Sequence, residues 1–229
     1  MDFKSAAYEK IKQEIVSGKL APGTVLNERE YAQKLGISRT PVHEAVWQLV
    51  GEGLLEVIPR RGTLVSHISM EDIRQMYEFR KMLEPQIVQL AAARADRGKL
   101  KNYRAFFEEL MREAESRGAE DAWKDDRDGE FHIFLAETMG NHYAVSQMRL
   151  MMTQTLRIRS LSNIRTKKRY TESCAEHINI IDSILEDNAK KAAELMLVHL
   201  KNSEQGYRNM LTRSYEQENN LQEAEILWI

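Results

Sequence analysis

Four side chains of metal-ligating type are spaced so that they can meet at one point. Asp128 and His132 lie four positions apart, and on a helix that spacing puts both side chains on one face. His177 and His199 lie at nearly equal distances before and after Asp187-Asn188. If the chain folds back there as an antiparallel helix pair, both histidines lie roughly 15–17 Å from the bend. The set suits zinc, nickel or a similar divalent ion; the alternative is a group of hydrogen-bonded core histidines.

A second group of candidate residues follows helical spacing on an inward-facing stripe. The stripe consists of Ile73, Tyr77, Arg80, Glu84, Ile87 and Ala91. A charge on such a stripe must be paired or functional, so Arg80 either grips a ligand carboxylate in a bidentate manner or forms an internal ion pair with Glu84. Tyr77 lines the same pocket or belongs to the core. Arg159, on another apolar stripe, is a further candidate for effector binding.

The N-terminal part carries residues that suit DNA. Ser38, Arg39, Thr40 and His43 lie at the start of the third predicted helix, where a helix-turn-helix protein reads base edges. Arg39 can donate two hydrogen bonds to guanine, and Ser38 and Thr40 suit phosphate oxygens. Other candidates for DNA contact are Arg29, at the start of the preceding helix, and Arg60, Arg61 and Gly62, at the tip of a predicted hairpin. Any one of these is a common surface residue or helix cap, but the ordered set is specific.

The predicted elements that position these residues change near residues 66–70, from short helices and a hairpin to long helices. Helices over 6–17, 28–35 and about 40–51 precede a hairpin formed by 54–58 and 63–65, because apolar periodicity is broken by Gly18, Gly36 and Pro59. The later part predicts long helices near 70–96, 99–117, 120–139, 142–162, 168–186 and 189–213. We therefore expect a mainly α protein with a winged helix-turn-helix over 1–68, an antiparallel helical bundle over 69–215, and a tail over 216–229.

Composition limits the class of protein. Hydrophobic residues make up 42% of the 229 residues, which is enough for a core, and no apolar run approaches the length of a membrane span. The chain has one cysteine, which fits a reducing cytoplasm. Its formal net charge of -2 gives no global basic signature, so the evidence for nucleic-acid binding is local.

The N-terminal motifs resemble the winged-helix domain of the GntR regulators over roughly residues 6–66. The matching segments are Leu20-Ala-Pro22-Gly23, Glu28-Arg29-Glu30-Tyr31-Ala32, Leu35-Gly36-Ile37-Ser38-Arg39-Thr40-Pro41-Val42, Glu44-Ala45 and Arg61-Gly62-Thr63. The resemblance places Arg29, Arg39 and Thr40 at DNA-contacting positions and Gly62 in the wing. His43 departs from the arginine usual in the family. A neutral histidine offers one donor and no permanent charge, so we predict either a different base preference there or DNA binding that weakens as the pH rises.

Residues 70–213 are similar to the all-helical ligand-binding (FCD) domain of the FadR-type branch of these regulators. The resemblance rests on Arg80-Lys-Met-Leu83-Glu84, on Asp128-x-x-x-His132, on Glu176-His177, and on Ala192-x-x-x-Met196-x-x-His199. It implies that Asp128, His132, His177 and His199 bind a divalent metal below an effector pocket, that the effector is a small organic acid, and that the protein is a homodimer on double-stranded operator DNA.

These observations predict a transcription regulator that acts as a repressor. Its operator affinity is expected to be controlled by a small carboxylate bound near a divalent metal. Two alternatives stay open. In a metal sensor the ion itself is the signal, and in a metal-dependent hydrolase the same residues activate water. The hydrolase lacks a convincing general base, because Glu130 and Glu176 lie at unhelpful helical phases relative to the ligands.

Overall fold

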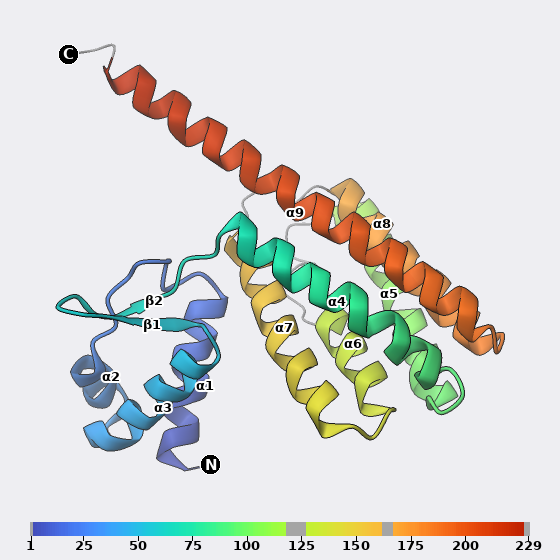
Figure 1. Ribbon diagram of the computed structural model, residues 1–229, viewed down its shortest axis with the longest axis horizontal. Helices are drawn as coiled ribbons and strands as arrows, with labels where there is room; N and C mark the ends of the chain where they lie inside the picture. The colour runs from blue at the N-terminus through green and yellow to red at the C-terminus, as the bar shows by residue number, and fades with distance from the viewer. Residues whose placement is uncertain (1, 118–126, 162–166, 227–229) are drawn as a thin grey trace. The chain divides into compact units, whose positions relative to one another are not determined.

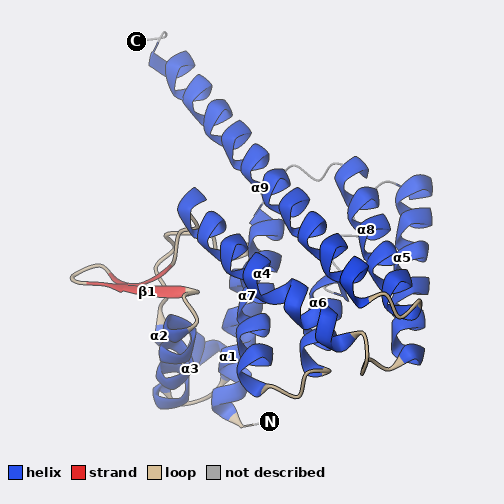
Figure 2. Ribbon diagram, turned by 45° about the vertical axis from the view of Figure 1, so that its right-hand side comes forward, coloured by secondary structure: helices blue, strands red, loops and turns tan. Residues whose placement is uncertain are grey.

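The computed structural model describes residues 2–117, 127–161 and 167–226, and the chain divides into two compact units. Unit 1 comprises Met1–Ile68 and Thr153–Leu161, and unit 2 comprises Ser69–Met152 and Ser162–Ile229. The predicted fold class is confirmed: the protein is mainly helical, and among the described residues the only sheet is a two-stranded one in unit 1 (Figure 2). None of the described helices combines the length and the apolar character that crossing a membrane requires.

Unit 1 has the order of elements of a winged helix-turn-helix. It contains α1 (Phe3–Val16), α2 (Glu28–Leu35), α3 (Arg39–Gly51), β1 (Leu55–Ile58) and β2 (Gly62–Val65) (Figure 1). The strands are antiparallel, with Leu55 opposite Val65 and Ile58 opposite Gly62. An isolated bridge joins Val25 to Leu64, which ties the segment before α2 to the wing.

Local signals explain the turn between α2 and α3. The Asn27 side chain accepts hydrogen bonds from the backbone of Arg29 and Glu30 and begins α2. Gly36 ends α2 with φ 65°, in the left-handed region that glycine adopts without strain. An apolar cluster forms the core of the unit. Its fully buried members include Ala7, Ile11, Ile15, Val42, Ala45, Leu49, Leu54 and Val65.

Unit 2 is built from helices alone among its described residues. They are α4 (Met70–Ala91), α5 (Arg97–Arg117), α6 (Arg127–Glu137), α7 (His142–Leu161), α8 (Lys167–Leu185) and α9 (Ala189–Ile226), of which the last part of α7 falls in unit 1. The closest packing is between α4 and α9, α5 and α8, and α8 and α9, and α4 lies alongside α9 in Figures 1 and 2. The helices α8 and α9 form the expected hairpin about Asp187-Asn188.

The two largest differences from the predicted helix bounds are at the ends of α4 and α9. The helix expected to reach residue 96 ends at Ala91, because the Asp96 side chain accepts from the backbone of Gly98 and Lys99 and begins α5 there. Helix α6 begins at Arg127, and the earlier part of the predicted helix lies outside the described residues. Helix α9 continues through the predicted tail to Ile226, since no glycine or proline follows Gly206 to stop it.

Candidate functional site

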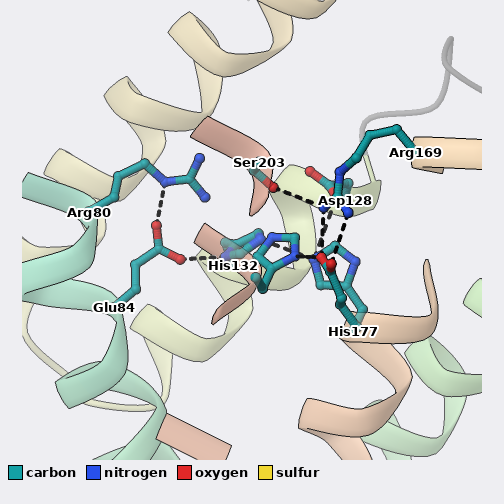
Figure 3. Close-up of polar contacts among 9 residues, drawn as sticks. Arg80, Glu84, Asp128, His132, Arg169, His177 and Ser203 are labelled. Carbon is teal, nitrogen blue, oxygen red and sulfur yellow. Dashed lines mark hydrogen bonds and ion pairs between the residues drawn. The ribbon is translucent and has the colours of Figure 1, made fainter. Parts of the chain in front are cut away.

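Three histidine side chains from three helices meet in the interior of unit 2, and Figure 3 labels two of them, His132 and His177. His132 lies on α6, His177 on α8 and His199 on α9, and each is at most 3% exposed. One ring nitrogen of each lies within 4.8 Å of those of the other two, and the Nε2 atoms of His132 and His177 are 3.3 Å apart. Oδ1 of Asp128 lies 3.5 Å from Nε2 of His177. The structure therefore brings all four sequence-predicted ligands together.

Carboxylates hold the outer nitrogens of two of these rings. Oε2 of Glu84 lies 2.5 Å from Nδ1 of His132, and Oε2 of Glu176 lies 2.8 Å from Nδ1 of His199. An ionised carboxylate only accepts hydrogen bonds, so each Nδ1 carries a proton, and a neutral ring in this tautomer keeps its lone pair on Nε2. This carboxylate–histidine arrangement is the one that fixes the tautomer of metal-binding histidines.

Glu84 also forms an ion pair with Arg80 one helical turn away. Nε of Arg80 donates to Oε1 of Glu84 at 2.5 Å, and the two side chains are 2% and 1% exposed. Burial opposes the ionisation of Glu84, but Arg80 and His132 outweigh it and lower the pKa of Glu84 to about 2. The internal Arg80–Glu84 pair left open by the sequence is thus present. It continues to His132, so the arginine is joined to the histidine cluster.

Glu176 is anchored in the same way on the other side of the cluster. Both guanidinium terminal nitrogens of Arg169 donate to it, at 2.8 and 2.7 Å, and Asn202 donates to Oε1 at 2.7 Å. Burial opposes its ionisation, but Arg169 and His199 prevail and hold the pKa of Glu176 below its usual range. Glu176 therefore stays a carboxylate that accepts from His199.

His177 lies in an apolar setting. Its ring stacks on Phe107, with centroids 4.5 Å apart, and its Nδ1 is buried with no hydrogen-bond partner among the described residues. Burial, together with the neighbouring His199, lowers the pKa of His177 well below its usual value. Burial also lowers the pKa of His199. Both rings are therefore neutral at pH 7, which is the form that ligates metals.

The donor set fits a divalent metal ion. Two imidazole nitrogens bound to one tetrahedral zinc, at Zn–N distances of about 2.0–2.1 Å, lie roughly 3.3 Å from each other. The Nε2 atoms of His132 and His177 have that separation, 3.3 Å. Without a cation or a proton between them, two inward lone pairs at this distance repel each other. Three imidazoles and one carboxylate are ligands that zinc and nickel both accept.

The three predicted effector-binding residues are placed differently. Arg80 joins the cluster through Glu84, and the ring of Tyr77, 0% exposed, lies 4.9 Å from the Arg80 guanidinium. Tyr77 also packs against Tyr207, with ring centroids 6.0 Å apart. Arg159 is buried, but it lies in the segment of α7 that belongs to unit 1. The structure therefore places Arg80 and Tyr77, and not Arg159, within the unit that holds the cluster.

All the predicted DNA-contacting residues lie on the exposed surface of unit 1. Ser38 is the N-cap residue of α3 and makes no side-chain cap hydrogen bond, so its hydroxyl is available to another acceptor or donor. Arg39, Thr40 and His43 follow on the exposed side of α3. Arg60 and Arg61 form the turn between β1 and β2, and Gly62 begins β2 with φ 94°.

The residues from α2 and α3 share one surface hollow. This hollow, of about 450 Å³, is lined by Val25, Leu26, Asn27, Glu28, Arg29, Arg39 and His43. Two arginines from successive helices thus line one open recess at the start of α3. That is where a helix-turn-helix presents its side chains to DNA.

Similarity to known families accounts for both units. Residues 3–65 match the family described as bacterial regulatory proteins of the gntR family. Residues 75–202, more than half of the chain, match the FCD domain. The chain belongs to the GntR family. It is a GntR transcription regulator with an FCD domain, as the sequence motifs predicted.

Relatives of this GntR chain agree in both sequence and fold. It is 25% identical over 212 residues to the uncharacterized HTH-type transcriptional regulator YdhC of Bacillus subtilis, which covers 91% of this chain and 92% of that one. It is 26% identical over 210 residues to the transcriptional regulator LutR of the same species, covering 83% and 94%. The solved structure of Escherichia coli McbR/YncC has a similar fold, with a TM-score of 0.75 at 18% identity, and covers 94% of this chain and 99% of that one.

Membership of the GntR family excludes the hydrolase alternative and leaves the metal sensor open. The family and the named relatives are transcriptional regulators, so the protein is a regulator and not a metal-dependent hydrolase.

Sequence reasoning missed two residues of the site. It set Glu176 aside because its phase points away from the other ligands, but that phase turns it to His199 on α9. It also paired Glu84 with Arg80 and overlooked the bond to His132, which no spacing in the sequence signals.

Proposed function

We propose that this GntR regulator is a repressor whose affinity for operator DNA is controlled by a small carboxylate effector bound beside a divalent metal ion. The observation that carries the proposal is the convergence of His132, His177 and His199 with Asp128, connected through Glu84 to a buried Arg80. When bound, the metal supplies a Lewis-acidic centre that a carboxylate oxygen of the effector can ligate.

The chain's own residues bind and orient the two partners of this site. The imidazoles of His132, His177 and His199 and the Asp128 carboxylate would hold the cation, while Glu84 and Glu176 accept from Nδ1 of His132 and His199 and so leave Nε2 for the metal. Arg80 supplies positive charge at the same place, which favours an anionic effector over a neutral one. Tyr77 packs on the guanidinium and limits its movement.

The proposed output is a shift between two states of a homodimer in the cytoplasm. Two copies of unit 1 contact the half-sites of a two-fold operator. Ser38, Arg39, Thr40 and Arg29 contact the major groove and its phosphates, and Arg60, Arg61 and Gly62 contact the DNA from the wing. An effector changes operator affinity only as far as it binds one state more tightly than the other.

Elemental analysis of untagged protein purified without chelator tests the metal part of the proposal. We expect about one zinc or nickel ion per chain in the wild type, and a loss of that metal in His177→Ala. The matched control is His142→Ala, which removes an exposed histidine of α7 and should keep the metal. A metal-free wild-type chain that is folded and binds DNA would contradict the proposal.

Binding to DNA selected from a random pool tests the effector part. Zinc-loaded protein is titrated with citrate, malate and lactate, and operator affinity is measured for the wild type and for Arg80→Gln. A carboxylate that releases the wild type from DNA and acts at much higher concentration on the variant supports the proposal. Operator affinity that follows zinc alone, with no response to any carboxylate, would identify a metal sensor instead.

A further inference from the structure

An aromatic side chain lies exposed on the helix that is expected to enter the major groove. Trp47 of α3 is 53% exposed, which is unusual for a tryptophan on a polar surface. It follows Arg39 and His43 at intervals of four residues, so the three side chains form one stripe along the helix. The opposite face of α3 is buried in the core of unit 1. Its residues are Val42, Ala45, Val46 and Leu49.

Both ring nitrogens of His43 are occupied by neighbouring side chains. Nε1 of Trp47 donates to Nε2 of His43 at 3.0 Å, and Nδ1 of His43 lies 3.1 Å from Oε1 of Glu28. An indole nitrogen can only donate, so Nε2 of His43 accepts, and the proton of the neutral ring lies on Nδ1, where Glu28 accepts it. His43 therefore has no donor left for a base edge or a phosphate.

The same contact decides which part of Trp47 is available to a partner. Its single polar group faces His43, so the exposed edge of the indole consists of carbon. The apolar feature of the major groove is the C5-methyl group of thymine. A contact with the phosphate backbone would need a donor, and the indole N–H is already used.

We propose that Trp47 determines operator specificity by packing against thymine methyl groups, and that His43 and Glu28 act as positioning residues that hold the indole in place. The inference rests on the proposed docking of α3 in the major groove. This inference gives His43 a different role from the one the sequence predicted. The histidine that stands where the family usually has arginine does not contact a base itself; it orients Trp47, which does.

The experiment uses the full-length protein and DNA selected by it from a random-sequence pool. Each thymine of the selected site is replaced singly by deoxyuridine, which removes only the methyl group, and affinities are measured by fluorescence anisotropy. We expect at least one position per half-site at which the replacement weakens wild-type binding by about fourfold, the value for one buried methyl group. In Trp47→Ala the same replacement should have no effect. Gln48→Ala, which alters the adjacent exposed residue, should respond like the wild type.

Variants of His43 test the positioning role. His43→Ala leaves the indole without its acceptor and should reduce the sensitivity to deoxyuridine. His43→Gln should restore it, because a glutamine can accept from Trp47 and donate to Glu28 at once. Circular dichroism checks that each variant is folded, which we expect because both side chains are exposed.

The outcomes separate this inference from the proposed function. If the wild type selects a defined sequence but no deoxyuridine replacement alters its affinity, the role of Trp47 is wrong and the docking of α3 stands. If Trp47→Ala weakens binding to every sequence equally, Trp47 contacts the backbone and the inference is again wrong. If the wild type selects no sequence, or Arg39→Ala binds the selected DNA unchanged, the proposed docking fails and the inference fails with it.

Discussion

Glu84 is shared by a guanidinium and an imidazole inside unit 2, and each of its two oxygens contacts one of them. One oxygen accepts from Arg80 and the other lies on Nδ1 of His132. Arg80 and Glu84 are almost fully buried, so neither charge can turn to water for compensation. Removing one partner of such a buried pair leaves the other uncompensated, which costs far more than the pair contributes over a neutral replacement.

We expect Glu84→Gln to lower the free energy of unfolding by about 3 kcal/mol, because the buried Arg80 charge loses the Glu84 carboxylate. Urea denaturation followed by circular dichroism measures the change. Glu78→Gln is the matched control on the same helix: Glu78 pairs with Arg74 on the surface, and its loss should cost less than about 0.5 kcal/mol. Equal effects of the two substitutions would show that the Arg80–Glu84 pair is solvated.

The sequence predicted the members of the histidine cluster better than the residues that support them. His177 and His199 were placed together because their distances from Asp187-Asn188 are alike, and helical rise converts equal distances into equal height. The partners of their outer nitrogens depend on which rotamers pack between helices. Glu84 and Glu176 come from α4 and α8 to rings on α6 and α9, and such contacts between distant segments leave no periodic signal.

At the scale of elements, a buried acidic side chain of α1 accepts a hydrogen bond from α2. Glu14 is 8% exposed, accepts hydrogen bonds from Tyr31 of α2 and from Lys19, and lies 3.3 Å from Lys10. Burial opposes its ionisation, but Lys19, Tyr31 and Lys10 outweigh it and lower the pKa of Glu14 from 4.5 to about 2. The ionised form thus stabilises the folded state of unit 1.

This shift predicts an acid-dependent loss of stability. Because the folded-state pKa is depressed, the contribution of Glu14 is complete above pH 4.5 and is lost as the pH falls from 4.5 toward 2. We expect the loss of unfolding free energy over that range to be smaller in Glu14→Gln than in the wild type by up to about 3 kcal/mol, since Glu84 and Glu176 keep their own depressed pKa in both proteins. Urea titrations at several pH values measure it. The control Glu9→Gln, altered at an exposed position of α1, should keep the wild-type pH profile.

The start of α4 depends on a capping box. The Ser69 hydroxyl accepts from the backbone of Asp72, and the Asp72 carboxylate accepts from the backbone of Ser69. We expect Ser69→Ala to lower the unfolding free energy by about 1 kcal/mol, the usual loss for a removed N-cap, as measured by urea denaturation. Ser146→Ala, on the exposed surface inside α7, should be neutral or stabilising because alanine is the better helix former. The prediction is contradicted if the two variants are equally stable.

Helix ends were the least predictable elements, for a physical reason. Helix ends marked by a glycine, such as Gly36 or Gly140, were predicted correctly, since few other residues adopt positive φ. The end of α4 at Ala91 and the continuation of α9 to Ile226 carry no such signal. Their bounds depend on caps and on packing against neighbours, which override weak propensities.

For the whole molecule, the proposed metal links helices that are far apart in the sequence, since α6, α8 and α9 supply its ligands. A ligand that binds only the folded state stabilises it by about 2.7 kcal/mol at a hundredfold excess over Kd. For a chain of this size we therefore expect zinc or nickel to raise Tm by roughly 5–10 °C, as measured by calorimetry. His177→Ala should show no rise, and His142→Ala should show the full one. A wild-type Tm that ignores both metals would contradict the prediction.

The hairpin of α8 and α9 also has a consequence for how this gene can change. The turn at Asp187, with φ 58°, and the Asn188 cap set where α9 begins, and His199 is counted from that point. One codon inserted between this turn and His199 would rotate the imidazole by about 100° around the helix axis and remove it from the cluster. Exposed positions in between, such as Lys190 and Lys191, can be substituted without moving His199. We therefore expect this segment to tolerate substitutions but not insertions or deletions, so that its length is preserved while its residue identities vary.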